Sequence, residues 1–159
     1  MHRIQWTLAA SVCLVAVAPA LADSPSTVQF LNSGRVLPTN LPFSEAVRVD
    51  DTLYLSGQIG LVPGTMKLAS GGLEAEARQA LENIKASLEA HGYSMRDVIK
   101  CTVMLADISE WAVFNEVYKA YFTAPYPARS TLGANGLALG ARVEVECVAV
   151  ARGTPGETR

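Results

Sequence analysis

Apolar and polar residues alternate near the end of the chain, between Val143 and Val150. One face of this segment carries Val143, Val145, Cys147 and Ala149, and the other carries Glu144, Glu146, Val148 and Val150. Such alternation with many β-branched residues is typical of a strand that is buried on one side. A similar pattern predicts strands at residues 46–49, 52–56 and 99–105, the first two joined as a hairpin through Asp50-Asp51, and residues 27–31 form a possible short edge strand.

Two segments instead repeat their apolar residues at helical spacing. Between Leu73 and His91 the repeat consists of Ala77, Leu81, Ile84 and Leu88, with charged residues between them. Gly92 then provides a helix stop. The segment Asp107–Glu110 has the form of a capping box and predicts a second helix that ends near Phe122. The predicted buried stripe of this second helix is Trp111, Phe114, Val117, Tyr118 and Tyr121.

The predicted element order is β-β-α-β-α-β-β, in which Arg129 begins the sixth element. This order favours an α+β fold, with two helices packed on one face of a mixed sheet. The other face would carry Tyr54, Thr102, Met104, Val148 and Val150 beside Glu144 and Glu146. Because two helices do not cover both faces, we expect this half-apolar face to be buried against another subunit.

The N-terminal residues have the pattern of a cleavable signal peptide. His2-Arg3 is basic, residues 6–18 are apolar, and Ala20-Leu21-Ala22 has the small-x-small form of a cleavage site. We therefore predict a signal peptide at 1–22, a single domain at 23–152 and a loose polar tail at 153–159. The predicted location is periplasmic or secreted, and no later segment is expected to span a membrane.

Charge and histidine content exclude several classes of function. The chain has 13 Lys+Arg against 15 Asp+Glu, a formal net charge of −2, which becomes −3 without Arg3. No basic cluster is present, so a nucleic-acid partner is disfavoured. Only His91 remains after the predicted signal peptide, which leaves no obvious base for a Ser-His-Asp triad and no ligand set for zinc.

Two cysteines remain as well, Cys101 and Cys147. Both lie on the apolar face of a predicted strand, where a free thiol packs as a small hydrophobic group. We therefore favour two buried free thiols over the disulfide that an oxidising compartment would permit.

The segment Tyr126–Leu132 carries the chemistry that stands out. Pro127 disfavours helix at Tyr126, so Arg129 begins an extended run. If this run and strand 143–150 are adjacent, Arg129 and Glu144 meet in one cleft. A guanidinium binds a carboxylate bidentately, and a carboxylate can activate water. The pair predicts a site for a small carboxylic acid.

Five sequence blocks are similar to those of the RidA family, also called YjgF/UK114, the reactive enamine/imine deaminases. They are Leu41-Pro-Phe-Ser-Glu-Ala-Val, Leu55-Ser-Gly-Gln-Ile, Phe114-Asn-Glu-Val-Tyr, Tyr126-Pro-Ala-Arg-Ser and Val143-Glu-Val-Glu-Cys-Val-Ala. The resemblance implies a chorismate-mutase-like fold and a homotrimer with clefts between its subunits. It also implies hydrolysis of 2-imino acids, derived from 2-aminoacrylate-type enamines, to 2-oxo acids and ammonia. No metal or organic cofactor is implied.

The resemblance also assigns roles to residues. Arg129 matches the arginine that binds the substrate carboxylate, and Glu144 the carboxylate that positions the attacking water. Ser56, Gly57 and Asn115 match residues that line the cleft. Phe43 stands where active members often have a tyrosine, and Thr131 stands where many have a cysteine.

Structural interpretations stand beside these roles. Arg129 alternatively forms a surface ion pair, and Glu144 pairs with Arg142 or Lys100 across the sheet. Ser56 alternatively only ends a strand, Asn115 only bridges the second helix, and Phe43 only packs in the core. Because Phe43 lacks a hydroxyl and the chain is expected to be exported, a non-catalytic protein that binds 2-oxo acids or amino acids is the alternative function. An endoribonuclease is less favoured because of the net charge.

Overall fold

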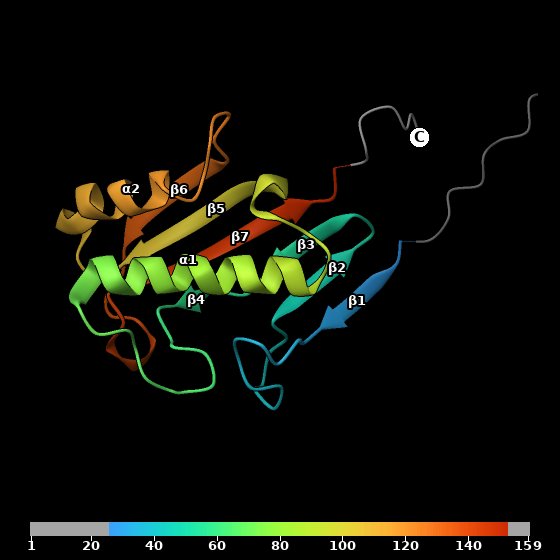
Figure 1. Ribbon diagram of the computed structural model, residues 1–159, viewed down its shortest axis with the longest axis horizontal. Helices are drawn as coiled ribbons and strands as arrows, with labels where there is room; N and C mark the ends of the chain where they lie inside the picture. The colour runs from blue at the N-terminus through green and yellow to red at the C-terminus, as the bar shows by residue number, and fades with distance from the viewer. Residues whose placement is uncertain (1–25, 153–159) are drawn as a thin grey trace, which may run out of the picture.

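The computed structural model describes residues 26–152. The predicted signal peptide and the predicted tail therefore lie outside the described residues. The described chain forms one mixed sheet with two helices against one of its faces (Figure 1). The predicted α+β fold and the short first strand are confirmed, and the element order is confirmed except for one short strand at Gln58–Ile59, which was not predicted.

The sheet has seven strands, and its order is β1-β2-β3-β7-β5-β6, with β4 also paired to β7. The strands are β1 (Val28–Leu31), β2 (Ala46–Val49), β3 (Thr52–Leu55), β4 (Gln58–Ile59), β5 (Val98–Leu105), β6 (Ala128–Gly133) and β7 (Val143–Val150). Only the β5–β6 pair is parallel. Strand β7 lies in the middle and pairs with β3, β4 and β5.

Helix α1 (Gly72–Ala90) lies across the sheet because its apolar stripe is continuous. The predicted residues Ala77, Leu81, Ile84 and Leu88 are all fully buried. At the end of α1, Gly92 has φ of 85°, which the absence of a side chain permits. The amide of Tyr93 donates to the carbonyl of Leu88 there, so the predicted helix stop is confirmed.

Helix α2 (Trp111–Lys119) is shorter than predicted, and its start differs from the predicted capping box. A short 3-10 helix, Ile108–Glu110, comes first, and the Asp107 carboxylate accepts from the Ser109 amide. The buried stripe of α2 itself is Phe114, Val117 and Tyr118. Trp111 was predicted to be buried, but it lies at the first turn and 46% of it is exposed.

Strand β5 departs from simple alternation at its beginning. The pairing with β7 shifts register between Val98 and Lys100. Because of this irregularity Val98 is buried, and Ile99, which was predicted to face the core, is 45% exposed. From Cys101 onward the predicted alternation holds.

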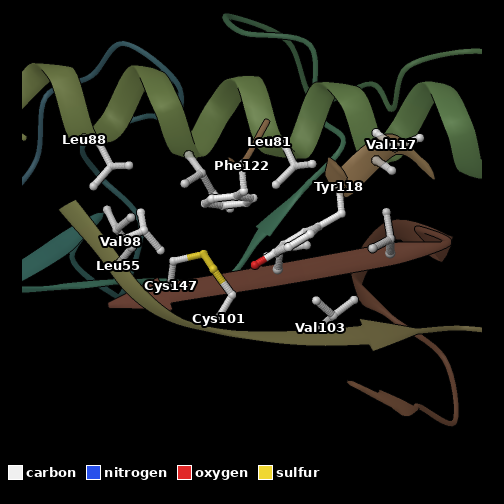
Figure 2. Packing of buried hydrophobic residues seen from close by; sticks show 14 of the residues in the cluster. Leu55, Leu81, Leu88, Val98, Cys101, Val103, Val117, Tyr118, Phe122 and Cys147 are labelled. Carbon is white, nitrogen blue, oxygen red and sulfur yellow. A yellow bond between two sulfur atoms is a disulfide. The ribbon is translucent and has the colours of Figure 1, made fainter. Parts of the chain in front are cut away.

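Cys101 and Cys147 form a disulfide between β5 and β7, so the preferred free-thiol interpretation is wrong. The antiparallel register places the two residues directly opposite each other, with Cα atoms 4.1 Å apart. Figure 2 shows the bond within the hydrophobic cluster that the two helices cover. The sequence placed both cysteines on apolar faces, but the register decides that they meet.

We expect that reducing this disulfide lowers the free energy of unfolding by about 2–4 kcal/mol, because the bond restricts a long segment of the unfolded chain. The two cysteines are 46 residues apart in sequence. Urea unfolding with and without a reductant measures the change. The Cys101→Ala/Cys147→Ala variant is the control, since its midpoint should not respond to the reductant. An equal midpoint for oxidised and reduced wild type would contradict the prediction.

Within residues 26–152, no helix covers the sheet face opposite α1 and α2. Tyr54 is 50% exposed and Leu132 is 46% exposed on this face, and Thr102, Met104 and Val148 lie between them, partly exposed. Arg129 and Glu144 lie on opposite faces of this sheet. No helix in residues 26–152 is long and apolar enough to cross a membrane.

Candidate functional site

Arg129 and Glu144 lie on opposite faces of the sheet. Strand β5 separates β6 from β7. The two strands are therefore not adjacent, although the predicted cleft requires them to be. Arg129 is paired with Cys101, whose side chain faces the helices. Glu144 is paired with Met104, whose side chain points to the other face of the sheet, the one that the helices leave uncovered. A single protomer therefore does not bring the two groups into one cleft.

The Arg129 guanidinium is held against helix α2. Its Nη2 donates to the Asn115 side-chain oxygen at 2.7 Å. Its central carbon lies 4.6 Å from the centre of the Tyr118 ring and 5.8 Å from that of Phe114, within the range of cation–π attraction. No carboxylate among the described residues pairs with Arg129. The alternative interpretation, a surface ion pair, is therefore not found within residues 26–152, and the cation remains available to an acid.

A pocket of about 380 Å³ opens beside this guanidinium. Helix α2 contributes Trp111, Asn115, Tyr118 and Lys119 to its lining, and the loop and strand after it contribute Tyr126, Pro127 and Arg129. The helical spacing predicted that the aromatic residues of this helix lie in the core alone. Tyr118 is instead both buried and in contact with Arg129, and burial raises the pKa of its hydroxyl although the charge of Arg129 opposes this.

Glu144 occupies a second, separate cluster. Its carboxylate lies over Gly57, where an added Cβ would be only 2.0 Å from Oε1. Strand β4 aligns Ile59 with Glu144, and Asn83 of α1 holds β4 by donating to the Ile59 and Leu61 carbonyls. Only glycine at position 57 permits this position of the carboxylate.

The electrostatics of Glu144 differ from those of an ordinary surface carboxylate. Partial burial, and secondarily the nearby charge of Glu146, raise its pKa above the usual value. The alternative ion pairs are not formed among the described residues. Arg142 pairs with Glu110 instead, and Lys100 donates to the Ser130 hydroxyl at 2.6 Å. Glu144 is thus an unpaired carboxylate whose proton affinity is increased, as suits a base that accepts a proton from water.

Ser56 and Phe43 are joined through the loop before β2. The Ser56 hydroxyl donates to the Ser44 carbonyl at 2.7 Å, and its amide donates to the Glu45 carbonyl. Ser56 therefore does more than end β3, because it fixes the loop that carries Phe43. Phe43 is 49% exposed, so the interpretation of it as a core residue is wrong.

Glu45 helps to hold the loop that carries Phe43, a role that was not predicted from the sequence. It is buried, and its carboxylate accepts from both the amide and the hydroxyl of Ser33, at 2.6 and 2.7 Å. The Asn32 side chain accepts from the Glu45 amide at 2.9 Å. These bonds anchor the loop next to Phe43. The local signal was weak, because nothing in the sequence marks a glutamate as buried.

Thr131 lies two positions after Arg129 on β6. It is paired with the buried Val103, so it shares the helix-facing side of the sheet with Arg129 and is partly exposed. It does not line the Arg129 pocket. The predicted residues therefore fall into two groups: Arg129, Asn115 and Thr131 on one side, and Glu144, Gly57, Ser56 and Phe43 around the other cluster.

A family model described as Endoribonuclease L-PSP matches residues 35–151, which include both groups. The chain belongs to this family, the RidA (YjgF/UK114) family. It is 47% identical over 109 residues to human 2-iminobutanoate/2-iminopropanoate deaminase, covering 69% of this chain and 80% of the human protein. It is 43% identical over 109 residues to the protein of the same name from Dermatophagoides farinae, covering 69% and 85%.

Solved structures of the RidA family share the fold. The crystal structure of RidA from the Antarctic bacterium Psychrobacter is 41% identical, with a TM-score of 0.73, and the match covers 77% of this chain and 99% of that one. E. coli TdcF with bound serine is 33% identical, with a TM-score of 0.72, and the match covers 78% and 99%. The chorismate-mutase-like architecture implied by the resemblance is confirmed.

Proposed function

We propose that this protein hydrolyses 2-imino acids to 2-oxo acids and ammonia. The observation that carries the proposal is the Arg129 guanidinium, which is fixed by Asn115 and Tyr118 beside an open pocket and lacks a carboxylate partner among the described residues. The names of the 2-iminobutanoate/2-iminopropanoate deaminase relatives, at 43–47% identity for the human and Dermatophagoides proteins, support the same reaction.

The chemistry requires few protein groups. An iminium carbon is already electrophilic, so the protein has to hold the acid and deliver water in the right direction. Arg129 binds the substrate carboxylate. Glu144 takes a proton from water as the water oxygen forms a bond to the iminium carbon, and the C=N π electrons move to nitrogen. Glu144 then returns its proton to that nitrogen, the C–N bond breaks and ammonia leaves, and the carbonyl forms as the oxygen loses the remaining proton of the former water to solvent.

The two groups meet only if neighbouring protomers combine them, so we infer a homotrimer with the sites between subunits. One protomer would supply Arg129 with Asn115, and the next would supply Glu144 with Gly57. Two observations support an assembly. The uncovered sheet face carries the half-exposed Tyr54 and Leu132, and among the described strands β6 lies at the edge and pairs with β5 alone.

We also infer export to the periplasm or beyond. The sequence pattern at 1–22 predicts a signal peptide, and the disulfide between Cys101 and Cys147 supports an oxidising compartment. The natural imine would then arise outside the cytoplasm.

Ammonia release from enzymatically generated 2-imino acids tests the reaction. An amino-acid oxidase with catalase produces the imine, and semicarbazide trapping follows its decay. We expect the purified protein to accelerate the decay and to yield equal amounts of ammonia and 2-oxo acid. Binding of 2-oxo acids by thermal shift without any acceleration would instead identify a non-catalytic binding protein and overturn the proposal.

A further inference from the structure

The pocket beside Arg129 has aromatic walls that a small imino acid does not need. Trp111 is 46% exposed and Tyr126 is 55% exposed, although both are large and partly apolar. They line the same pocket as the guanidinium, and Pro127 lies with them. We propose that this protein prefers 2-imino acids with a large aromatic side chain, which would lie between Trp111 and Tyr126. The inference rests on the imine hydrolysis proposed above.

The pocket has room for such a substrate. Its volume is about 380 Å³, and it is open to the outside, so an aromatic ring can enter beside the guanidinium. This volume admits both a small and a large imino acid, and the preference is inferred from the aromatic walls.

The charges in the pocket select an acid with one carboxylate. Lys119 also lines the pocket, but its Nζ lies 2.7 Å from the Glu116 carboxylate. The Glu116 carboxylate thus offsets the charge of Lys119. The partners of Arg129 among the described residues are Asn115 and two aromatic rings, which leave its charge uncompensated. A second carboxylate on the substrate would compete with Glu116 for Lys119. Among the described residues, the pocket thus offers one cation without a carboxylate partner, beside mainly aromatic walls.

The geometry orients an aromatic substrate as well as accommodating it. Tyr118 and Asn115 hold the Arg129 guanidinium in place, so the substrate carboxylate binds at a fixed position in the pocket. The substrate side chain then extends toward the exposed Trp111 and Tyr126, where aromatic pairs gain about 0.5–1.5 kcal/mol each beyond the buried area. Two such contacts correspond to roughly a tenfold preference or more at 1.4 kcal/mol per factor of ten.

Initial rates on two imines test this preference. The imines of phenylalanine and alanine are generated with suitable amino-acid oxidases and assayed at matched concentrations. We expect kcat/KM of the wild type to be about tenfold higher for the phenylalanine imine. Equal values, or a higher value for the alanine imine, would overturn the inference and leave the proposed reaction intact. No acceleration of either imine would instead refute the reaction, and the inference with it.

Variants locate the preference within the pocket. We expect Trp111→Ala and Tyr126→Ala each to lower the ratio of the two kcat/KM values about threefold, since two equal contacts together give the tenfold preference. Val113→Ala is the matched control, because Val113 is 49% exposed on the same helix and does not line the pocket. Its ratio should equal that of the wild type. If both aromatic variants keep the assembly in light scattering and keep the wild-type ratio, these residues do not select the substrate and the inference is wrong.

Discussion

Replacing Arg129 with alanine is expected to lower kcat/KM for 2-imino acids about a thousandfold, because two charge-assisted hydrogen bonds of roughly 1.5–3 kcal/mol each are lost and 1.36 kcal/mol corresponds to a factor of ten. The guanidinium is the only free cation that the described residues place in the pocket. Its removal also leaves Asn115 without the donor that it holds at 2.7 Å. Steady-state kinetics with the oxidase-coupled assay measure the effect.

Two further variants control this prediction. Arg129→Lys keeps the charge but loses the planar fork, so it should retain part of the activity. Arg78→Ala removes an exposed arginine that pairs with Glu74 on α1 and does not line the Arg129 pocket, and it should behave as the wild type. Because Arg129 also contacts Tyr118, thermal unfolding must show that the alanine variant is folded. A folded Arg129→Ala protein with wild-type kcat/KM would remove the mechanism.

Replacing Glu144 with glutamine is expected to lower kcat about a hundredfold to a thousandfold, within the range found for general bases. Glutamine has nearly the same shape, so the contact over Gly57 should be preserved. The effect would then come from the lost base and not from packing. An unchanged kcat would show that water is activated elsewhere.

The pH dependence of the wild type follows from the raised pKa of Glu144. A general base must be ionised, so activity should rise as the pH increases through the pKa of Glu144. Because this pKa is raised, activity should already be lost at a pH at which an ordinary glutamate is still ionised. Glu146→Gln removes the neighbouring charge that contributes to the shift. The acid limb of its pH profile should therefore move to lower pH. An acid limb that stays in place would argue against Glu144 as the titrating group.

Mixed assemblies of the two inactive variants test whether the site forms between subunits. A protomer with Glu144→Gln still supplies Arg129, and a protomer with Arg129→Ala still supplies Glu144. Random mixing in equal amounts in a cyclic assembly should restore about a quarter of the wild-type activity, because one in about four interfaces joins two intact halves. Activity that stays at the level of the variants after mixing would place both groups in the same protomer.

The residues of the site were recognisable in the sequence, but their arrangement was not. Arg129 and Glu144 each lie on a strand that local pattern predicts correctly. The expectation that these strands are adjacent failed because β5, which comes earlier in the chain, is inserted between them. This insertion, together with the alternation along each strand, puts the two side chains on opposite faces.

Two other outcomes have the same origin. The cysteines lie on apolar faces, as the alternation predicts, but only the β5–β7 register brings them together. Trp111 and Tyr118 fit one helical stripe in the sequence. The helix begins at Trp111, so this residue is exposed and lines the pocket. Tyr118 is buried and contacts Arg129.

The sequence by itself determined the element order, the helix stop at Gly92, the faces of the central strands and the family blocks. These features depend on residues close together in the chain, whose periodicity and backbone preferences act locally. The tertiary structure alone decided the strand order, the disulfide, the separation of Arg129 from Glu144 and the aromatic walls of the pocket. These depend on which distant segments pack together, and the alternation within one strand carries no information about its neighbour.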